Sequence, residues 1–335
     1  MLILRLLVGL VLLLQFACAS RVGERLPRRG DEIVIAGQYF HTGTPVVLWT
    51  DPGGYDAYRV ERRFAPIDRA SWEASKEKIA TPNRYGTRRV SLSPQAAEQV
   101  RGGGWELDLL RQHVDQFVIH YDVCGTSRTC FQVLHDQRCL SVHFMLDIDG
   151  TIYQTLDVKE RAWHATTAND RAVGIEIANI GAYPPGKPSP LDSWYATDAA
   201  GPYVTLPSRL GDGGVRTKGF IARPARSQRI AGDIHGVAYE MYDLTPQQYE
   251  SLARLTATLC RVLPGLACDY PRDAQGDLVA RAMTPDELDA HRGLLGHFHI
   301  TKGKIDPGPA FDWDKVVRRA RALGAPRSIS PRLAP

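Results

Sequence analysis

The sequence predicts an α/β fold in which helices cover a central β-sheet. Short apolar runs such as Phe117–Tyr121 and Val173–Ala178 are typical of buried strands. Helix-start signals, in which a capping Ser or Thr is followed by Pro, occur at Ser93, Thr245 and Thr284. Because apolar strands alternate with helices along the chain, the pattern indicates a sheet flanked by helices.

The first 19 residues differ in composition from the rest of the chain. Leu2–Leu14 is almost entirely aliphatic, and small residues follow it at positions 17–19. We interpret residues 1–19 as a secretory signal peptide, because a membrane-spanning anchor would need about 20 apolar residues. Residues 17–19 fit an A-x-A cleavage site, but Ala17-Cys18 also resembles a lipoprotein box, so membrane attachment by a lipid at Cys18 stays an open alternative. We expect an exported protein of the periplasm, the outer membrane or the cell surface.

The overall composition is that of an ordinary globular protein. Hydrophobic residues make up 44% of the 335 residues, which is enough to bury a core. The 41 basic residues nearly balance the 37 acidic ones, so the sequence predicts no nucleic-acid partner. The length suggests about two domains, or one domain with long insertions, and we expect a monomer.

Residues 20–105 are predicted to form an N-terminal extension without a catalytic group. Ile33–Ala36 and Pro45–Trp49 are predicted strands, and a helix is predicted to begin after Ser93. We interpret His41, the only histidine of this region, as an ordinary polar residue. The extension is expected to act as a packing arm or as a lid over the domain that follows.

Residues 106–325 are predicted to form the main domain, followed by a C-terminal tail over residues 326–335. A hairpin is predicted around the turn Asp149-Gly150, with strands over Ser141–Asp147 and Thr151–Leu156. Helices are predicted after the capping residues Thr245 and Thr284. The remaining elements predicted near the C-terminus are a strand over Leu294–Ile300 and a helix over Trp313–Leu323.

Residues 181–243 interrupt this domain. The segment is rich in Pro and Gly and has little periodicity. A structureless stretch of this length inside a domain is usually a functional loop system or an insertion, and we expect one of these here.

Export would permit disulfide bonds. Beyond Cys18, the chain has cysteines at positions 124, 130, 139, 260 and 268. The preferred pairs are Cys124 with Cys130 and Cys260 with Cys268, which would each close a short loop and leave Cys139 over. The connectivity itself does not follow from the sequence.

Two histidines and a carboxylate suggest a metal site. His120 ends a predicted strand, His297 lies on another, and Asp306 lies in a loop constrained by Pro307 and Pro309. Such a His₂-carboxylate set suits Zn²⁺ and leaves a fourth position for water. Zinc lowers the pKa of that water to about 7, so hydrolysis of an amide becomes feasible near neutral pH.

Two further residues are candidates for catalysis. Glu176 lies among apolar residues, where burial should raise its pKa, and it is the candidate general base. Lys304 lies two residues before Asp306 and could stabilise an oxyanion. The simpler alternatives are a structural ion pair for Glu176 and a solvated surface lysine for Lys304. His135, His235 and His291 are interpreted as surface or structural residues.

Five segments together resemble the zinc-dependent N-acetylmuramoyl-L-alanine amidases, a superfamily that includes the peptidoglycan recognition proteins. The segments are VIHY, SVHFMLDIDGTIYQ, AWHA, VGIEIAN and GHFHITKGKIDPGPAFDW, and they occur in the family's order. The resemblance covers Asp115–Leu323, with the insertion at 181–243 as the main departure. It implies a central mixed β-sheet flanked by helices, to which this chain adds the N-terminal extension and the insertion.

The resemblance also implies roles for individual residues. It implies a Zn²⁺ ion with His120, His297 and Asp306 as ligands, Glu176 as the catalytic acid/base and Lys304 as the transition-state stabiliser. His299 would face the same side as His297 in a strand, but the family pattern uses the first His of this motif. His143 and His164 lie in family motifs, and we expect them to shape the cleft or contact the substrate. The C-x₅-C spacing resembles a disulfide of the recognition proteins and favours the pair Cys124–Cys130.

The implied activity is hydrolysis of the amide between N-acetylmuramic acid and L-alanine in peptidoglycan or muropeptides. One alternative is a non-catalytic peptidoglycan-binding receptor, although such relatives typically lose a zinc ligand and all three are present here. A second alternative, which the unusual insertion leaves open, is a zinc hydrolase of another amide.

Overall fold

The computed structural model describes residues 27–58 and 85–326. By its contacts the chain divides after Gly30, and every element below belongs to the unit that begins at Asp31. The predicted signal peptide, Cys18 and all but the first residue of the predicted tail lie outside the described residues. No helix within the described ranges is long and apolar enough to cross a membrane.

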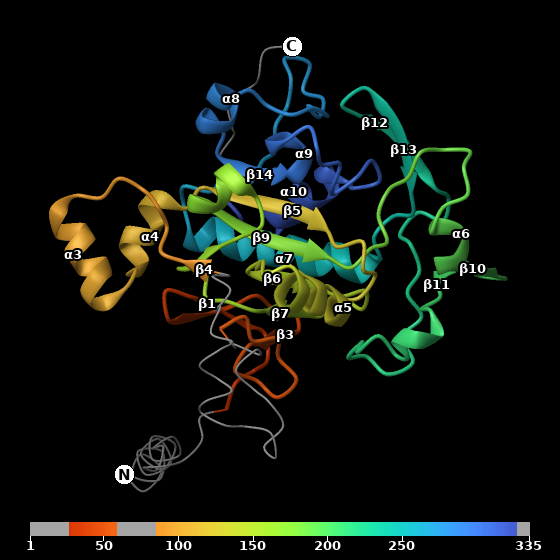
Figure 1. The fold of residues 1–335 in the computed structure, drawn as a ribbon, viewed down its shortest axis with the longest axis horizontal. Coiled ribbons are helices and arrows are strands. Elements are labelled where there is room, and N and C mark those ends of the chain that lie inside the picture. The colour runs from red at the N-terminus through yellow and green to blue at the C-terminus, as the bar shows by residue number, and fades with distance from the viewer. Residues whose placement is uncertain (1–26, 59–84, 327–335) are drawn as a thin grey trace, which may run out of the picture. The chain divides into compact units, whose positions relative to one another are not determined.

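A six-stranded mixed sheet forms the centre of the fold (Figure 1). Its strands, in spatial order, are β14 (Gly293–Gly296), β5 (Gln116–Tyr121), β9 (Ala172–Ile177), β6 (Phe144–Leu146), β7 (Ile152–Gln154) and β3 (Val46–Leu48). The first four strands are parallel, whereas β7 runs antiparallel to β6 and parallel to β3. The predicted mixed sheet and the predicted β6–β7 hairpin are therefore confirmed.

Two helices, α7 (Pro246–Val262) and α10 (Trp313–Ala322), pack against the sheet through one buried cluster. Leu255 of α7 and Val316 of α10 share this cluster with Phe117 of β5. Side chains alternate between the two faces along a strand, and Val118 belongs to a different cluster. His120, two residues after Val118, therefore lies on the face of the sheet turned away from α7 and α10.

The two predicted capping boxes are present. Thr245 accepts a hydrogen bond from the Gln248 backbone N–H, and the Gln248 side chain accepts one from the backbone N–H of Thr245, at the start of α7. Thr284 and Glu287 form the same reciprocal pair at the start of α8 (Pro285–Ala290). These helix starts were predictable because each depends on residues only three positions apart.

The N-terminal part of the chain contributes directly to the main sheet. A hairpin of β1 (Glu32–Ile35) and β2 (Gln38–His41) precedes β3, which is the edge strand beside β7. Farther along, β4 (Tyr85–Gly86) pairs with β8 (Arg161–Ala162). Helices α3 (Pro94–Gly103) and α4 (Leu107–His113) then lead into β5, and Ser93 caps α3 as predicted.

The strand predicted over Leu294–Ile300 is wrong in its second half. Strand β14 ends at Gly296, and His297–Ile300 forms a single helical turn, α9. Apolar residues alternate with polar ones here, but the turn closes when the Thr301 N–H bonds to the carbonyl of His297. In a strand the side chains of His297 and His299 would point to the same side, whereas in a helical turn they point in opposite directions.

The expectation of a structureless segment over residues 181–243 is also wrong. The segment contains a short helix, α6 (Leu191–Trp194), and two hairpins. The hairpin strands are β10 (Tyr195–Asp198), β11 (Gly201–Val204), β12 (Ile230–Ile234) and β13 (Val237–Met241). Most of their side chains are exposed or half-buried, so they lack the apolar alternation that marks a half-buried strand.

The five described cysteines are free thiols in this structure. The predicted partners nevertheless lie together: the Cys130 thiol contacts that of Cys124, and the Cys260 thiol contacts that of Cys268. The two disulfides therefore stay predictions, between cysteines that the fold already brings into contact.

Candidate active site

Neighbouring strands place His120 and Glu176 side by side. Strand β5 runs parallel to β9, and the register pairs His120 with Glu176 near the carboxyl ends of both strands. Paired residues on neighbouring strands point to the same face of a sheet. Sheet pairing thus joins two residues that are far apart in the sequence.

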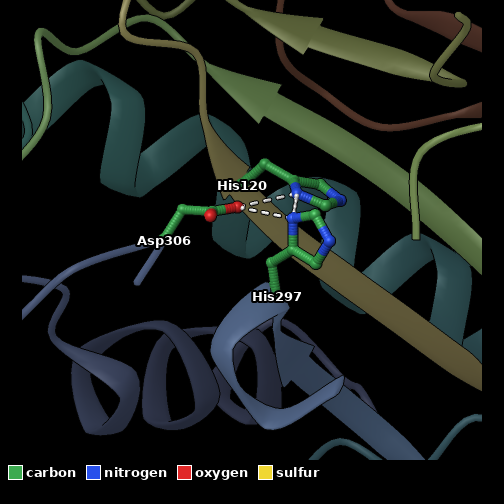
Figure 2. Close-up of side chains that lie close together, drawn as sticks. All are labelled: His120, His297 and Asp306. Atoms are coloured by element: carbon green, nitrogen blue, oxygen red, sulfur yellow. Dashed lines mark hydrogen bonds and ion pairs between the residues drawn. The ribbon is translucent and has the colours of Figure 1, made fainter. Parts of the chain in front are cut away.

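The loop after β14 brings the other two candidate ligands to His120. His297 opens α9, and Asp306 follows in the loop between α9 and α10. Asp306 Oδ2 lies 2.8 Å from His120 Nδ1 and 3.1 Å from His297 Nδ1, and the two ring nitrogens are 3.0 Å apart. Figure 2 shows the three side chains converging on one point.

The donor set fits a zinc ion. Zinc at about 2.0–2.2 Å from each of three tetrahedrally arranged ligands would hold the donor atoms roughly 3.3 Å apart, close to the spacing observed. The three residues are buried, with exposed fractions of 2% for His120, 6% for His297 and 7% for Asp306. This group could hold a metal ion.

The protonation states also suit metal binding. Burial, followed by the charge of His297, lowers the pKa of His120 to about 4, so its imidazole is neutral at pH 7. Burial alone would raise the pKa of Asp306, but hydrogen bonds from His120 and His297 outweigh it and hold that pKa below its usual value. A neutral imidazole and a carboxylate are the forms that bind a metal.

Glu176 is half-buried and has a buried carboxyl oxygen without a partner among the described residues. Burial, followed by the charges of Asp306 and Asp122, raises the pKa of Glu176 well above its usual value. Its Oε2 is buried and has no hydrogen-bond partner among the described residues. This leaves a carboxyl oxygen free to exchange a proton within the pocket.

A pocket of about 560 Å³ opens over this group. Glu176, His164 and Lys304 line it together with the three candidate ligands. Its lining also includes the exposed residues Arg89 and Arg138, whose guanidinium groups form no ion pair with any described residue. The sequence contained no signal for these two arginines, since neither belongs to a motif or a patterned run.

The N-terminal extension contributes Arg89 to the pocket wall, and the preceding residue, Arg88, is buried and anchors it. Arg88 is 2% exposed and donates hydrogen bonds to the carbonyl oxygens of Asn169, Ala172 and Val158. Burial lowers the pKa of Arg88 to about 10, which leaves it charged at pH 7. Arg88 anchors the extension against the main domain, and the next residue then lies in the pocket wall.

His164 and His143, predicted to shape the cleft or contact substrate, occupy different positions. His164 lines the pocket, and its Nδ1 lies 3.0 Å from Nε2 of His120. His143 is fully buried and does not line the pocket. Its Nδ1 accepts a hydrogen bond from the Gly174 N–H and its Nε2 contacts the Glu160 carbonyl oxygen. The expectation that His143 contacts substrate is therefore corrected. Its ring is buried behind the residues that line the pocket, next to the ring of His164.

His299 lies outside the group of candidate ligands. Residues two apart in a helical turn point about 200° apart, so His297 and His299 face opposite ways within α9. His299 is fully buried, and its Nδ1 accepts a hydrogen bond from the Gly296 N–H. The prediction from the family pattern, that His297 belongs to the group and His299 does not, agrees with this geometry. The expectation that both histidines face the same side, which assumed a strand, does not hold because residues 297–300 form a helical turn.

Residues 110–207 match the family model of the N-acetylmuramoyl-L-alanine amidases. The chain is similar to this family over that segment. The amidase-family segment includes His120 and Glu176, whereas His297, Lys304 and Asp306 lie beyond its end. The fold, and not the matched segment, therefore brings the second half of the candidate site to the first.

Several solved amidase structures show a distant likeness to the chain. AmiD from E. coli, in complex with a substrate, anhydro-N-acetylmuramic acid-L-Ala-D-γ-Glu-L-Lys, is 18% identical, with 62% of this chain and 57% of that chain covered and a TM-score of 0.34. AmpDh3 from Pseudomonas aeruginosa, in complex with anhydromuramic pentapeptide, is 18% identical, with 62% and 60% covered and a TM-score of 0.35. The chain thus spans less than two thirds of either protein. Likeness at this level carries no conclusion about function, and comparison with curated proteins found no match.

Proposed function

We propose that this protein is a zinc-dependent N-acetylmuramoyl-L-alanine amidase. The substrate would be peptidoglycan or a muropeptide, cut between the lactyl group of N-acetylmuramic acid and L-alanine. The observation that carries the proposal is the convergence of His120, His297 and Asp306 beside Glu176, in a pocket whose first half lies in an amidase-family segment.

The proposed roles follow from the position and chemistry of each side chain. His120, His297 and Asp306 would hold Zn²⁺, which supplies a polarised carbonyl and a water of lowered pKa. Glu176 would take a proton from the attacking water through Oε2 and return it to the leaving amine of L-alanine, as its unpartnered oxygen and raised pKa allow.

Lys304 would stabilise the negative charge that develops on the carbonyl oxygen. This half-buried residue lines the pocket, and its charge acts on both Glu176 and His120. A cation placed where charge develops typically lowers a barrier more than it tightens substrate binding.

The mouth of the pocket favours an anionic substrate. Arg89 and Arg138 are exposed there without an ion-pair partner among the described residues. Peptide stems carry free carboxylates, which guanidinium groups bind in a two-pronged geometry. We therefore assign these two arginines to the peptide part of the substrate.

Digestion of peptidoglycan tests the proposal. The wild-type protein with zinc should release free stem peptides, detected by mass spectrometry, and Glu176→Gln should lower turnover by about 10²–10⁴-fold while zinc stays bound. Binding of peptidoglycan without release of peptides would instead indicate a receptor. Wild-type turnover by Glu176→Gln would contradict the proposed mechanism.

Export and lipid attachment are proposed from the N-terminal sequence alone. The intact mass of the protein from its native host distinguishes the two fates of Cys18. Cleavage before Cys18 with the mass of added acyl chains indicates a lipoprotein, and cleavage after Ala19 indicates a secreted enzyme. Size-exclusion chromatography with light scattering tests the expected monomer.

A further inference from the structure

The tip of the β12–β13 hairpin contacts the backbone of Lys304, one of the residues that line the candidate active site. Ile234 pairs with Val237, so the hairpin turns in two residues, His235 and Gly236, with φ values of 56° and 75°. Two successive positive φ values define a type I′ turn, in which Asn-Gly is the preferred pair. Histidine tolerates the left-handed region better than most residues, but turn formation alone does not explain its presence.

The imidazole of His235 joins three separate segments. Its Nδ1 accepts a hydrogen bond from the Ala282 backbone N–H at 3.2 Å. In a neutral imidazole the other nitrogen then carries the proton, so Nε2 donates to the backbone carbonyl oxygen of Lys304, 2.9 Å away. The His235 backbone N–H also donates to the carbonyl of Ala280.

The same hairpin packs against the far end of the loop that carries Lys304 and Asp306. A Cβ atom placed on Gly232 of β12 would lie 3.0 Å from Cβ of Pro309, so the two backbones approach closely. Met241 of β13 shares a buried cluster with Ala310. The hairpin therefore contacts the loop on both sides of Asp306.

The backbone hydrogen bonds around Lys304 are local, although the next residue, Ile305, packs against two buried clusters. Lys302 and Gly303 are exposed, and the Lys304 backbone N–H bonds only to the carbonyl of Thr301, within the same turn. Among the described residues, the hydrogen bond from His235 is the one that joins the Lys304 backbone to a distant element. Displacing a catalytic group by about 1 Å can cost about 10²-fold in rate.

We infer that the β12–β13 hairpin positions the loop that carries Lys304 and that His235 is the positioning residue for Lys304. The inference rests on the proposed amidase activity and on the proposed role of Lys304. It gives the insertion a function: His235 holds the Lys304 backbone, and the hairpin strands hold the loop beyond Asp306.

Kinetics of four variants test the coupling. His235→Asn keeps a residue suited to the turn but is too short to bridge Ala282 and Lys304, so kcat should fall by about 10- to 100-fold with KM changed less than about twofold. In a Lys304→Met background, His235→Asn should cause almost no further loss, because two residues that act as a unit are non-additive. Val237→Thr, on an exposed residue of the same hairpin, should match the wild type. Additive losses would overturn the inference.

Hydrogen exchange supplies a readout independent of activity. Backbone exchange over residues 301–306 should rise in His235→Asn and stay unchanged in Val237→Thr, while α7 stays protected in both. If the wild type releases no peptide, the proposed function fails, and the exchange measurement still decides whether His235 holds the loop. Unchanged exchange over residues 301–306 would overturn the inference. Should His235→Asn fail to fold, Gly232→Ala, which crowds Pro309 and keeps His235, should raise the same exchange.

Discussion

His164 Nδ1 lies 3.0 Å from Nε2 of His120, the ring nitrogen opposite the one that contacts Asp306. If His120 Nδ1 is a metal donor, the proton of the neutral ring lies on Nε2, and this N–H donates a hydrogen bond to Nδ1 of His164. Such an outer partner fixes the tautomer and direction of a liganding histidine. His164, which we expected to shape the cleft or contact the substrate, thus contacts the candidate metal ligand His120 and also lines the pocket.

Gly174 makes room for this arrangement. A Cβ atom at this position would lie 2.5 Å from Cε1 and 2.6 Å from Nδ1 of His164. We therefore expect Gly174→Ala to lower the free energy of unfolding by about 1–3 kcal/mol through overpacking, measured by urea denaturation. Adding His164→Ala should recover most of the loss, because the shorter side chain vacates the space. A stable single variant would show that the ring lies elsewhere.

Zinc analysis separates His297 from His299. Purified wild type should bind one zinc ion per chain, and His297→Ala and Asp306→Ala should lose affinity by more than about 100-fold, the upper range for loss of an outer-shell partner. His299→Gln should retain zinc, because His299 points away from the group and its Nδ1 is occupied by Gly296. Zinc retained in His297→Ala but lost in His299→Gln would reverse the assignment.

Lys302 provides a control for the proposed role of Lys304 in stabilising the oxyanion. Lys304 is half-buried in the pocket wall, whereas Lys302 is exposed and does not line the pocket. Lys304→Met should lower kcat by about 10²–10³-fold with zinc still bound, and Lys302→Met should leave kcat unchanged. Equal losses in the two variants would point to general loop disruption, and no loss in Lys304→Met would remove the proposed role.

Asp147 provides a test of stability against pH. It is fully buried, its Oδ2 has no hydrogen-bond partner among the described residues, and burial raises its pKa to about 7 from 3.8. A carboxyl with a raised pKa contributes stability that is complete below pH 4 and is lost as the pH rises towards 7, because only the unfolded chain then ionises readily. Relative to the wild type, Asp147→Asn should therefore gain up to about 4 kcal/mol between pH 4 and pH 7.5.

Chemical denaturation at both pH values gives this comparison. The quantity of interest is the change with pH in the difference between Asp147→Asn and the wild type, since a direct effect of the substitution contributes equally at both. A difference that does not change with pH would show that Asp147 titrates normally in the folded protein.

Several elements followed from local patterns alone. The starts of α7 and α8 depend on reciprocal hydrogen bonds between residues three apart, and β5 and β9 are mostly apolar runs. Such features involve only neighbours in sequence, so composition and spacing predict them. The hairpins of the insertion escaped prediction because strands β10–β13 lie partly exposed and lack an apolar face.

The chemical character of the site was visible in the sequence: two histidines, two carboxylates and a lysine, in motifs of one family. Packing alone decided which of the remaining histidines face that site. A period change at Gly296 turns His299 away, packing of Gly174 and Glu160 around its ring buries His143, and the tip of a hairpin brings His235 to the backbone of Lys304. The last two outcomes depend on contacts between residues 17 to 69 positions apart in the sequence, and the spacing of residues along a chain does not encode the distance between such segments in space.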